Sequence, residues 1–149
     1  MKKILYILML SFVFVGCGSS GGSNTVTNES INPDKLISES DLILLDAYEN
    51  GLSNIQVEGE GKVLAVLEDD TSGSQHQKFI LLLATDQTLL ISHNIDLAPR
   101  VENLKEDDFV AFYGEYEWND EGGVIHWTHI DPQGIHEDGW LKHNGIVYQ

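Results

Sequence analysis

The sequence predicts a small, mainly β domain that is built as one barrel and preceded by one helix. Apolar residues recur at helical spacing before residue 51, and from residue 55 onward their period changes towards two. Turn residues then separate five strand-like segments, at 55–68, 76–85, 88–95, 109–118 and 123–130. A long first strand that carries two glycines is typical of a small five-stranded antiparallel barrel of the OB type, and a small β-sandwich is the alternative.

The helix is predicted over about Asp34–Asn50, with a break near Ser38–Ser40. Asn32-Pro33 can start a helix, and Gly51 can end it. We expect its apolar stripe to pack against the strands that follow. The stripe consists of Ile43, Leu44, Ala47 and Tyr48.

Local signals predict the bends and turns of the strands. Gly59 and Gly61 indicate a bulge or a sharp bend in the first strand. Asp86-Gln87 is predicted as a two-residue hairpin turn, and Asp131-Pro132 ends the fifth strand. The tail carries Ile146-Val147-Tyr148 next to its last residue, which predicts a short edge strand.

The first seventeen residues predict where the protein works. Lys2 and Lys3 precede an apolar run over residues 4–15, which is too short for a spanning helix and is typical of a bacterial export signal. Phe14-Val15-Gly16-Cys17 resembles a lipoprotein signal box, in which the cysteine is lipidated and becomes the new N-terminus. We therefore expect a signal peptide at 1–16, a lipidated Cys17 with a flexible tether at 17–31, and one β-rich domain with its N-terminal helix at 32–149. Because residue 18 is glycine rather than aspartate, the expected location is the cell envelope, on the outer membrane facing the periplasm if the cell has two membranes.

The charge balance restricts the partners. The chain has 24 acidic and 8 basic residues, a formal charge of −16, and removal of residues 1–16 with their two lysines takes the charge to −18. Nucleic-acid backbones and anionic membrane surfaces both require clustered lysine and arginine, so neither is an expected partner. The expected partners are the membrane, through the N-terminal lipid alone, and an unknown small molecule or envelope component.

Several unusual blocks lie after residue 58. They are HNIDLAPR (93–100), GEYEWN (114–119), DPQGIHEDGW (131–140) and the tetrapeptide His126-Trp127-Thr128-His129. On these blocks the chain resembles the bacterial family catalogued as domain of unknown function 3465, whose signature is that tetrapeptide. The family is uncharacterised, so the resemblance implies membership and no activity.

Histidine is the main candidate for chemistry, since neutral imidazole is both a common metal ligand and a common general base. The six histidines are at positions 76, 93, 126, 129, 136 and 143. With a two-residue turn at 86–87, His76 and His93 share one sheet face about 13 Å apart, which is too far for one metal ion. His76 is then expected to form a hydrogen bond with Asp96.

The second hairpin predicts an acidic cluster around one imidazole. If Trp118 lies opposite Gly123, His126 lies opposite Glu115 on the outer face, with Glu117 and Thr128 on the same side. Trp127 then faces the core. The Glu115–His126 pair is interpreted as a cross-strand salt bridge, and the alternatives are an acid–base pair or a metal site.

A metal site is predicted where the fifth strand ends. His129, Asp131 and His136 can converge in that loop, with His126 nearby, and two imidazoles with a carboxylate are a ligand set of zinc and iron sites. Glu115 or Glu117 would then be the catalytic base. The cofactor that this implies is a divalent transition metal such as zinc.

A second group of residues is a candidate ligand-binding surface. Arg100 can clamp a carboxylate or a phosphate, or it can pair with a nearby acid such as Asp96, Glu102 or Asp107. His93 lies in the same HNIDLAPR block. Trp118 and Trp140 are candidates to line a sugar or peptide groove.

Three functions are consistent with these features. The first is a lipid-anchored, OB-like binding or envelope-interaction module. The second is a metal-dependent envelope hydrolase that uses the histidine and aspartate cluster. The third is a sensor of pH or metal, since six imidazoles on so acidic a chain are expected to titrate together near pH 6. The barrel itself does not choose among them, because OB-type folds carry many functions.

Overall fold

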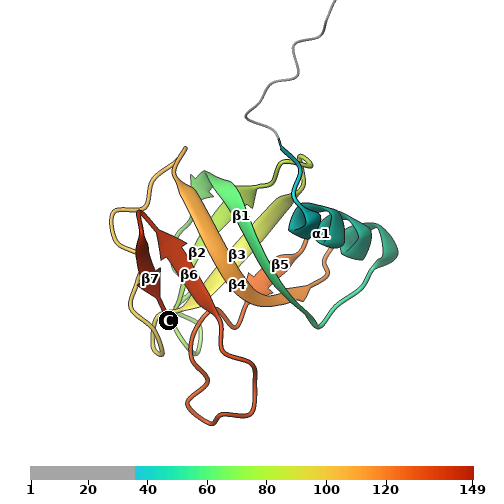
Figure 1. The fold of residues 1–149 in the computed structure, drawn as a ribbon. Coiled ribbons are helices and arrows are strands. Elements are labelled where there is room, and N and C mark those ends of the chain that lie inside the picture. The colour runs from blue at the N-terminus through green and yellow to red at the C-terminus, as the bar shows by residue number, and fades with distance from the viewer. Residues whose placement is uncertain (1–35) are drawn as a thin grey trace, which may run out of the picture. The chain divides into compact units, whose positions relative to one another are not determined.

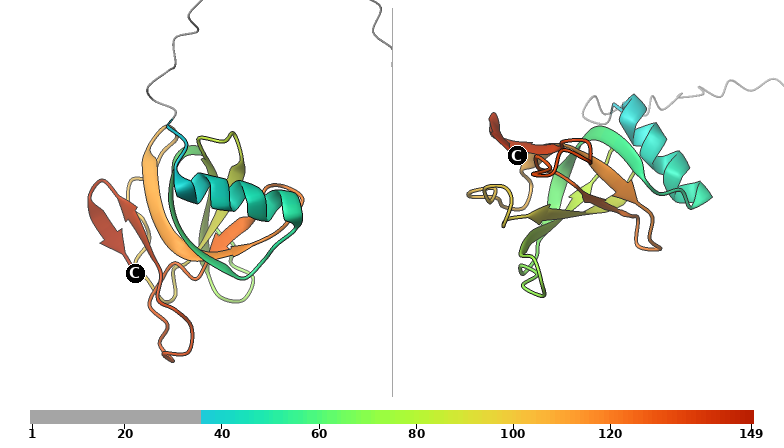
Figure 2. Two further views of the ribbon diagram at one scale, coloured as in Figure 1. Left: turned by 45° about the vertical axis from the view of Figure 1, so that its right-hand side comes forward. Right: turned by 90° about the horizontal axis from the view of Figure 1, so that it is seen from below.

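The computed structural model describes residues 36–149, which lie within one compact unit, residues 32–149. The predicted signal peptide, Cys17 and the tether lie outside the described residues. The described chain begins with helix α1 (Glu39–Asn50), which lies beside the first strand, on the side of the barrel away from the C-terminal hairpin (Figures 1 and 2).

Helix α1 is shorter than the sequence predicts. Ser38 is its N-cap and forms a capping box with Asp41, so the helix begins at the expected break instead of running through it. It ends at Gly51, as expected, in the left-handed conformation. Of the predicted stripe, Leu44 and Ala47 are buried in the core, whereas Ile43 is 44% exposed.

Seven strands follow α1 in the described chain, and they form one sheet. The order of the strands in the sheet is β1-β2-β3-β5-β4-β6-β7. An additional pairing between β1 and β4 closes strands β1 to β5 into a barrel. Their bounds are β1 Ile55–Val66, β2 His76–Leu82, β3 Thr88–Asn94, β4 Phe109–Glu117, β5 Val124–His126, β6 Trp140–His143 and β7 Ile146–Tyr148.

The closed five-stranded barrel confirms the predicted mainly β, OB-like fold. One pairing differs from a purely antiparallel barrel, because β3 and β5 run parallel through Leu90 opposite Val124 and Ile91 opposite Ile125. Alternate residues of each strand point inward, as the burial of β2, β3 and β4 shows. Phe79, Phe112, Tyr116 and a set of leucines, isoleucines and valines fill the interior.

The long first strand takes part in two pairings. Its first part, Ile55–Lys62, pairs with β4, and its last part, from Lys62 onward, pairs with β2. At Gly59 the Phe112 ring packs where a side chain would stand, with a Cβ position only 2.6 Å from the ring. The irregularity in register lies between Val63 and Ala65, a few residues after the predicted position at Gly59 and Gly61.

The turn between β2 and β3 is longer than predicted. Leu82 pairs with Thr88, and the Leu83 N–H donates to the Gln87 carbonyl, with Asp86 in the left-handed conformation. The register is therefore three residues away from the prediction, which exchanges the two faces of one strand relative to the other. His93 lies opposite Gln77 inside the barrel, and His76 lies opposite Asn94.

The C-terminal part also differs from the prediction. Strand β5 ends at His126, because Trp127 adopts the left-handed conformation (φ 52°) and turns the chain away. The tail then forms a hairpin, in which β6 pairs with β4 and β7 is the expected edge strand. A loop, residues 127–139, connects β5 to β6 and projects from the barrel (Figure 1).

Candidate metal centre

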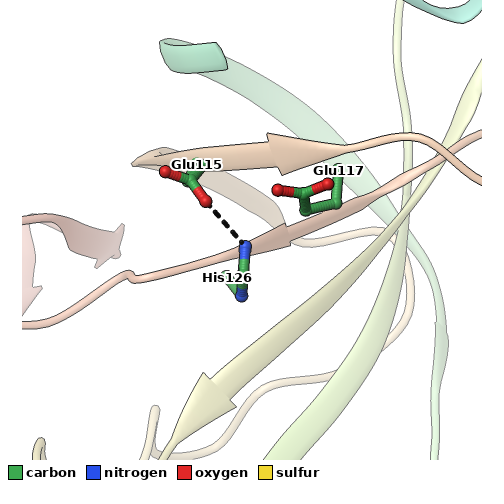
Figure 3. Close-up of side chains that lie close together, drawn as sticks. All are labelled: Glu115, Glu117 and His126. Atoms are coloured by element: carbon green, nitrogen blue, oxygen red, sulfur yellow. Dashed lines mark ion pairs between the residues drawn. The ribbon is translucent and has the colours of Figure 1, made fainter. Parts of the chain in front are cut away.

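The β4–β5 hairpin places three ligand-type side chains together. Glu115 pairs with His126 and Glu117 pairs with Val124, which confirms the predicted register of this hairpin. Because the alternate residues of β4 are buried, Glu115 and Glu117 lie on the outer face of the barrel. One ligand atom from each of Glu115, Glu117 and His126 lies within 4.8 Å of the other two (Figure 3).

The His126 ring is held against Glu115 without a hydrogen bond. Its Nε2 atom lies 3.3 Å from Glu115 Oε1, yet it is buried and has no hydrogen-bond partner among the described residues. Two ligands of a tetrahedral zinc ion, each roughly 2.0–2.1 Å from the metal, are about 3.3 Å apart. The His126–Glu115 separation therefore suits two donors to one metal ion.

Glu117 has no hydrogen bond or ion pair with any residue in the described chain, and it lies beside the same imidazole (Figure 3). Two carboxylates that share one small site repel each other unless a cation lies between them. The cluster therefore has both the donor atoms and the charge that a divalent cation requires.

His136 reaches the same carboxylate from the 127–139 loop. Its Nε2 atom lies 2.8 Å from Glu115 Oε2, and its Nδ1 atom lies 2.8 Å from the Glu137 carbonyl. Both ring nitrogens face acceptors, an arrangement that favours the protonated ring, which donates from both nitrogens. Burial alone lowers the pKa of His136, but the hydrogen bonds to Glu115 and Glu137 and the nearby carboxylates outweigh it, and the pKa is raised above its usual value.

Trp127 holds the His136 ring in place. The two rings stack with centroids 4.0 Å apart and planes 7° from parallel. The left-handed backbone at Trp127 takes its indole out of the barrel wall, where the sequence predicted it to face the core. A bulky residue seldom adopts this conformation, and here its consequence is the stack on His136.

The rest of the 127–139 loop is organised by Asp131. Its carboxylate accepts hydrogen bonds from the backbone N–H groups of Gln133, Ile135 and His136, which lower its pKa. The loop closes where the Gly139 N–H donates to the His129 carbonyl. A Cβ at Gly139 would lie 1.9 Å from the Trp127 carbonyl, so only glycine fits at the point where the loop closes.

The predicted metal ligands are therefore only partly brought together. His126 and His136 both contact Glu115, whereas the Asp131 carboxylate is occupied by backbone N–H groups. His129 is buried, and its Nδ1 donates to the Ile130 carbonyl. Glu115 and Glu117, predicted as bases, lie together with His126 in a group that could hold a metal ion. For Glu115 and His126 the sequence left a metal site open as an alternative, and their pairing follows from the hairpin register. The contact of His136 with Glu115 could not be predicted in this way, because it depends on the path of the 127–139 loop.

His93, a predicted ligand-binding residue, lies inside the barrel. It is completely buried, its Nε2 donates to the Pro99 carbonyl, and its Nδ1 accepts from the Thr128 hydroxyl, at 3.0 and 2.9 Å. Burial lowers the pKa of His93 to about 4, so the ring is neutral. Thr128, predicted on the outer face, is buried as its partner. This buried, neutral ring is a structural group, not a surface for a ligand.

The other histidines have separate partners. His143 is buried and its Nε2 lies 2.9 Å from Asp108 Oδ2. His76 donates to the Ser74 carbonyl and not to Asp96, whose carboxylate accepts from the Gln75 N–H. Since the pKa values of His93 and His136 move in opposite directions, the expected joint titration of all six histidines near pH 6 is wrong.

The other predicted ligand-binding residues do not form one groove with this cluster. Arg100 forms its ion pair with Asp69, which is none of the expected acids. The Trp118 indole N–H donates to the Tyr48 carbonyl at the end of α1, so this side chain fastens the helix to the barrel. Trp140 lies beside Tyr113 with ring centroids 6.3 Å apart, and the Tyr113 hydroxyl donates to Glu137 of the loop.

The fold and the cluster define a class of protein: an OB-like barrel with carboxylates and imidazoles gathered on the outer face of β4 and β5. The chain belongs to the family described as protein of unknown function (DUF3465), whose model matches residues 28–149. No curated protein and no solved structure matches the chain. In the described part of the chain, no helix is long and apolar enough to span a membrane.

Proposed function

We propose that this protein is an exported, lipid-anchored binding module that holds a divalent transition metal ion at Glu115, Glu117 and His126. One observation carries the proposal. Among residues 36–149, the buried His126 Nε2 has no hydrogen-bond partner, and it lies beside two carboxylates, 3.3 Å from Glu115 Oε1, a separation that suits two donors to a single ion.

The donor set fits a divalent metal of intermediate hardness. One imidazole and two carboxylates suit zinc, iron or manganese, and they would neutralise the charge of the ion. His136 donates to the second oxygen of Glu115, which fixes the orientation of that carboxylate toward the ion. Trp127 keeps His136 in position through the stacking contact.

The proposed location rests on the N-terminal sequence. Residues 2–15 have the charge and length of an export signal, and the Cys17 segment resembles a lipidation site. The strong acidity of the chain supports an envelope partner or a small molecule in preference to nucleic acid.

The test is the metal content of residues 28–149, which include every core residue of the barrel. The fragment is expressed without chelators, and bound zinc, iron and manganese are measured and then titrated back. We expect about one ion per chain, with the affinity at least a hundredfold lower in Glu115→Gln and in His126→Ala. The matched control is His76→Asn, since the hydrogen bond of the His76 ring within the described chain is to the Ser74 carbonyl, away from the cluster. Failure of every ion to bind, or equal binding by the variants, would contradict the proposal.

A metal-dependent hydrolase is the second candidate. Three protein ligands leave coordination positions free for water and substrate, which is the arrangement of catalytic zinc sites. The test loads the fragment with each metal and screens chromogenic esters and phosphodiesters. A hydrolysis rate lost in Glu117→Gln favours the enzyme, whereas metal binding without any hydrolysis favours the binding module alone.

A further inference from the structure

The outer face of the barrel carries a row of three polar side chains on three adjacent strands. Gln56 of β1 pairs with Glu115 of β4, and Glu115 pairs with His126 of β5. Residues paired across antiparallel strands point to the same face. Val57, the neighbour of Gln56 in β1, is buried in the core, so Gln56 points outward with Glu115.

Both flanking members of this row have buried polar atoms that form no hydrogen bond with the described residues, although His126 Nε2 lies within ion-pair distance of Glu115. Gln56 Oε1 and Nε2 have no hydrogen bond within the described chain, and neither has His126 Nε2. Buried polar atoms are seldom left unpaired in folded proteins, and an unpaired carboxamide costs stability unless a ligand or an ion satisfies it. Gln56 and His126 lie on either side of the Glu115 carboxylate, so one bound ligand or ion can account for the missing hydrogen bonds of both side chains.

The 127–139 loop covers this part of the sheet. His136 is bonded to Glu115, and the adjacent Glu137 is bonded to the hydroxyl of Tyr113, the diagonal neighbour of Gln56 on β4. The Gln56 carboxamide is thus enclosed near the Glu115 carboxylate and forms no hydrogen bond with the described residues of the barrel. A glutamine offers one oxygen that can bind a cation and one N–H₂ group that can hydrogen-bond a carboxylate.

We infer that Gln56 is a further metal ligand, and that its amide oxygen sets which metal the site prefers. The inference rests on the proposed metal site and deepens it. With Gln56 the donors become one nitrogen and three oxygens, a harder set than Glu115, Glu117 and His126 alone. Carboxylate and carbonyl oxygens suit Mn²⁺, whereas imidazole suits Zn²⁺, so the amide oxygen increases the preference for Mn²⁺.

The experiment compares Mn²⁺ and Zn²⁺ binding to the 28–149 fragment and its Gln56 variants. Mn²⁺ binding is followed by the paramagnetic resonance signal of the free ion, and Zn²⁺ binding by competition with a chromophoric chelator. Gln56→Met keeps the length of the side chain and removes both polar atoms. We expect it to weaken Mn²⁺ binding at least tenfold and Zn²⁺ binding by less, and we expect Gln56→Glu to strengthen Mn²⁺ binding.

A matched control is Gln87→Met. Gln87 is also buried with an unpaired Oε1, but it lies outside the row and donates to the Gly122 carbonyl. Its metal affinities should equal those of the wild type. The melting temperature of metal-free Gln56→Met should match or exceed that of the wild type, because an apolar group of similar shape replaces an unpaired buried amide.

The outcomes separate this inference from the proposed function. If Glu115→Gln abolishes binding while Gln56→Met leaves both affinities unchanged, Gln56 is not a ligand and the three-residue site stands. If the wild type binds neither ion, both proposals fail. Should Gln56→Met not fold, Gln56→Glu decides alone: unchanged Mn²⁺ affinity in that variant overturns the inference.

Discussion

His93 and His136 lie on opposite sides of one barrel wall, and their surroundings shift their pKa values in opposite directions. Inside, His93 faces a hydroxyl and a carbonyl, and burial lowers its pKa to about 4. Outside, His136 faces a carboxylate and a carbonyl, and its pKa is raised. Two successive residues contact the two rings: Thr128 bonds to His93, and Trp127 stacks on His136. Both come directly after His126 in the chain.

The tetrapeptide at 126–129 thus contributes to both networks: Thr128 belongs to the inner network around His93, and His126 belongs to the outer cluster around Glu115. The inner network satisfies every nitrogen of its imidazole, so it stabilises the barrel and has no donor atom left for a ligand. In the outer cluster, His126 Nε2 and the Glu117 carboxylate form no hydrogen bonds with the part of the chain that the structure describes, so the cluster retains donor atoms for an ion. Stability and binding should therefore respond to separate substitutions.

The largest expected effect is a loss of stability in acid that comes from His93. The unfolded ring has a pKa near 6.5 and the folded ring about 4, so the unfolded state binds the proton first. The contribution of neutral His93 is complete above pH 6.5 and falls as the pH decreases to 4, by about 3 kcal/mol at 1.36 kcal/mol per unit. Denaturant unfolding at a series of pH values, with chelator present, measures it.

A His93→Gln variant is the control for this pH dependence. Glutamine can replace both hydrogen bonds and does not titrate, so the free energy of unfolding should vary much less between pH 6.5 and 4.5. His136 works in the opposite direction, since a raised pKa favours the folded state below pH 6.5 and that contribution is lost as the pH rises through the folded value. An unchanged slope in His93→Gln would show that the inner ring is not the acid-sensitive group.

The second-largest expected effect is a loss of stability without a loss of metal affinity, caused by a substitution on the inner side of the barrel wall. Thr128→Val keeps the shape of the side chain but removes the hydroxyl that donates to His93 Nδ1. A buried acceptor without a donor costs about 2 kcal/mol, so the free energy of unfolding should fall by that amount. Metal affinity, measured by the same titration as above, should stay within a factor of two. A large loss of metal affinity would show that the two faces are coupled.

For a substitution in the outer cluster we expect the reverse, which is a loss of metal affinity with little change in stability. Glu115→Gln removes the charge that contacts both His126 and His136, and the side chains involved are partly exposed. Ion pairs of this kind contribute at most about 1 kcal/mol, so unfolding of the metal-free protein should change little. Metal binding should be lost. Loss of folding with metal affinity retained would reverse the roles assigned to the two faces.

The barrel could be predicted from the sequence where short turns fix the register. The turn at Asn119–Gly123 is short enough to place Glu115 opposite His126, and that pairing is confirmed. The β2–β3 turn misled the prediction because Asp86 adopts the left-handed conformation, which lengthens the loop and moves His93 from one face to the other. The predicted placement of His76 and His93 on one face about 13 Å apart is therefore wrong. The two residues belong to adjacent cross-strand pairs and lie on opposite faces of the sheet.

The candidate site could be predicted only in part. Alternation along β4 is a local property, so Glu115 and Glu117 could be assigned to one face. The contact of His136 with Glu115 depends on the path of the 127–139 loop, which Asp131 and Gly139 determine through backbone contacts. Gln56 belongs to the row only because β1 pairs with β4, a closure that joins residues far apart in the sequence.

The smallest expected effect tests the residue that separates the two faces. Trp127→Asn should be almost neutral in stability, because asparagine tolerates the left-handed backbone, which costs other residues about 1 kcal/mol, while the stack on His136 contributes about the same amount. Metal affinity should fall severalfold, since His136 is no longer held over Glu115. Trp127→Phe, which keeps an aromatic ring for the stack, should retain most of the affinity. If both variants bind metal as the wild type does, the stack does not position His136, and the left-handed turn serves only to bring Thr128 inside to His93.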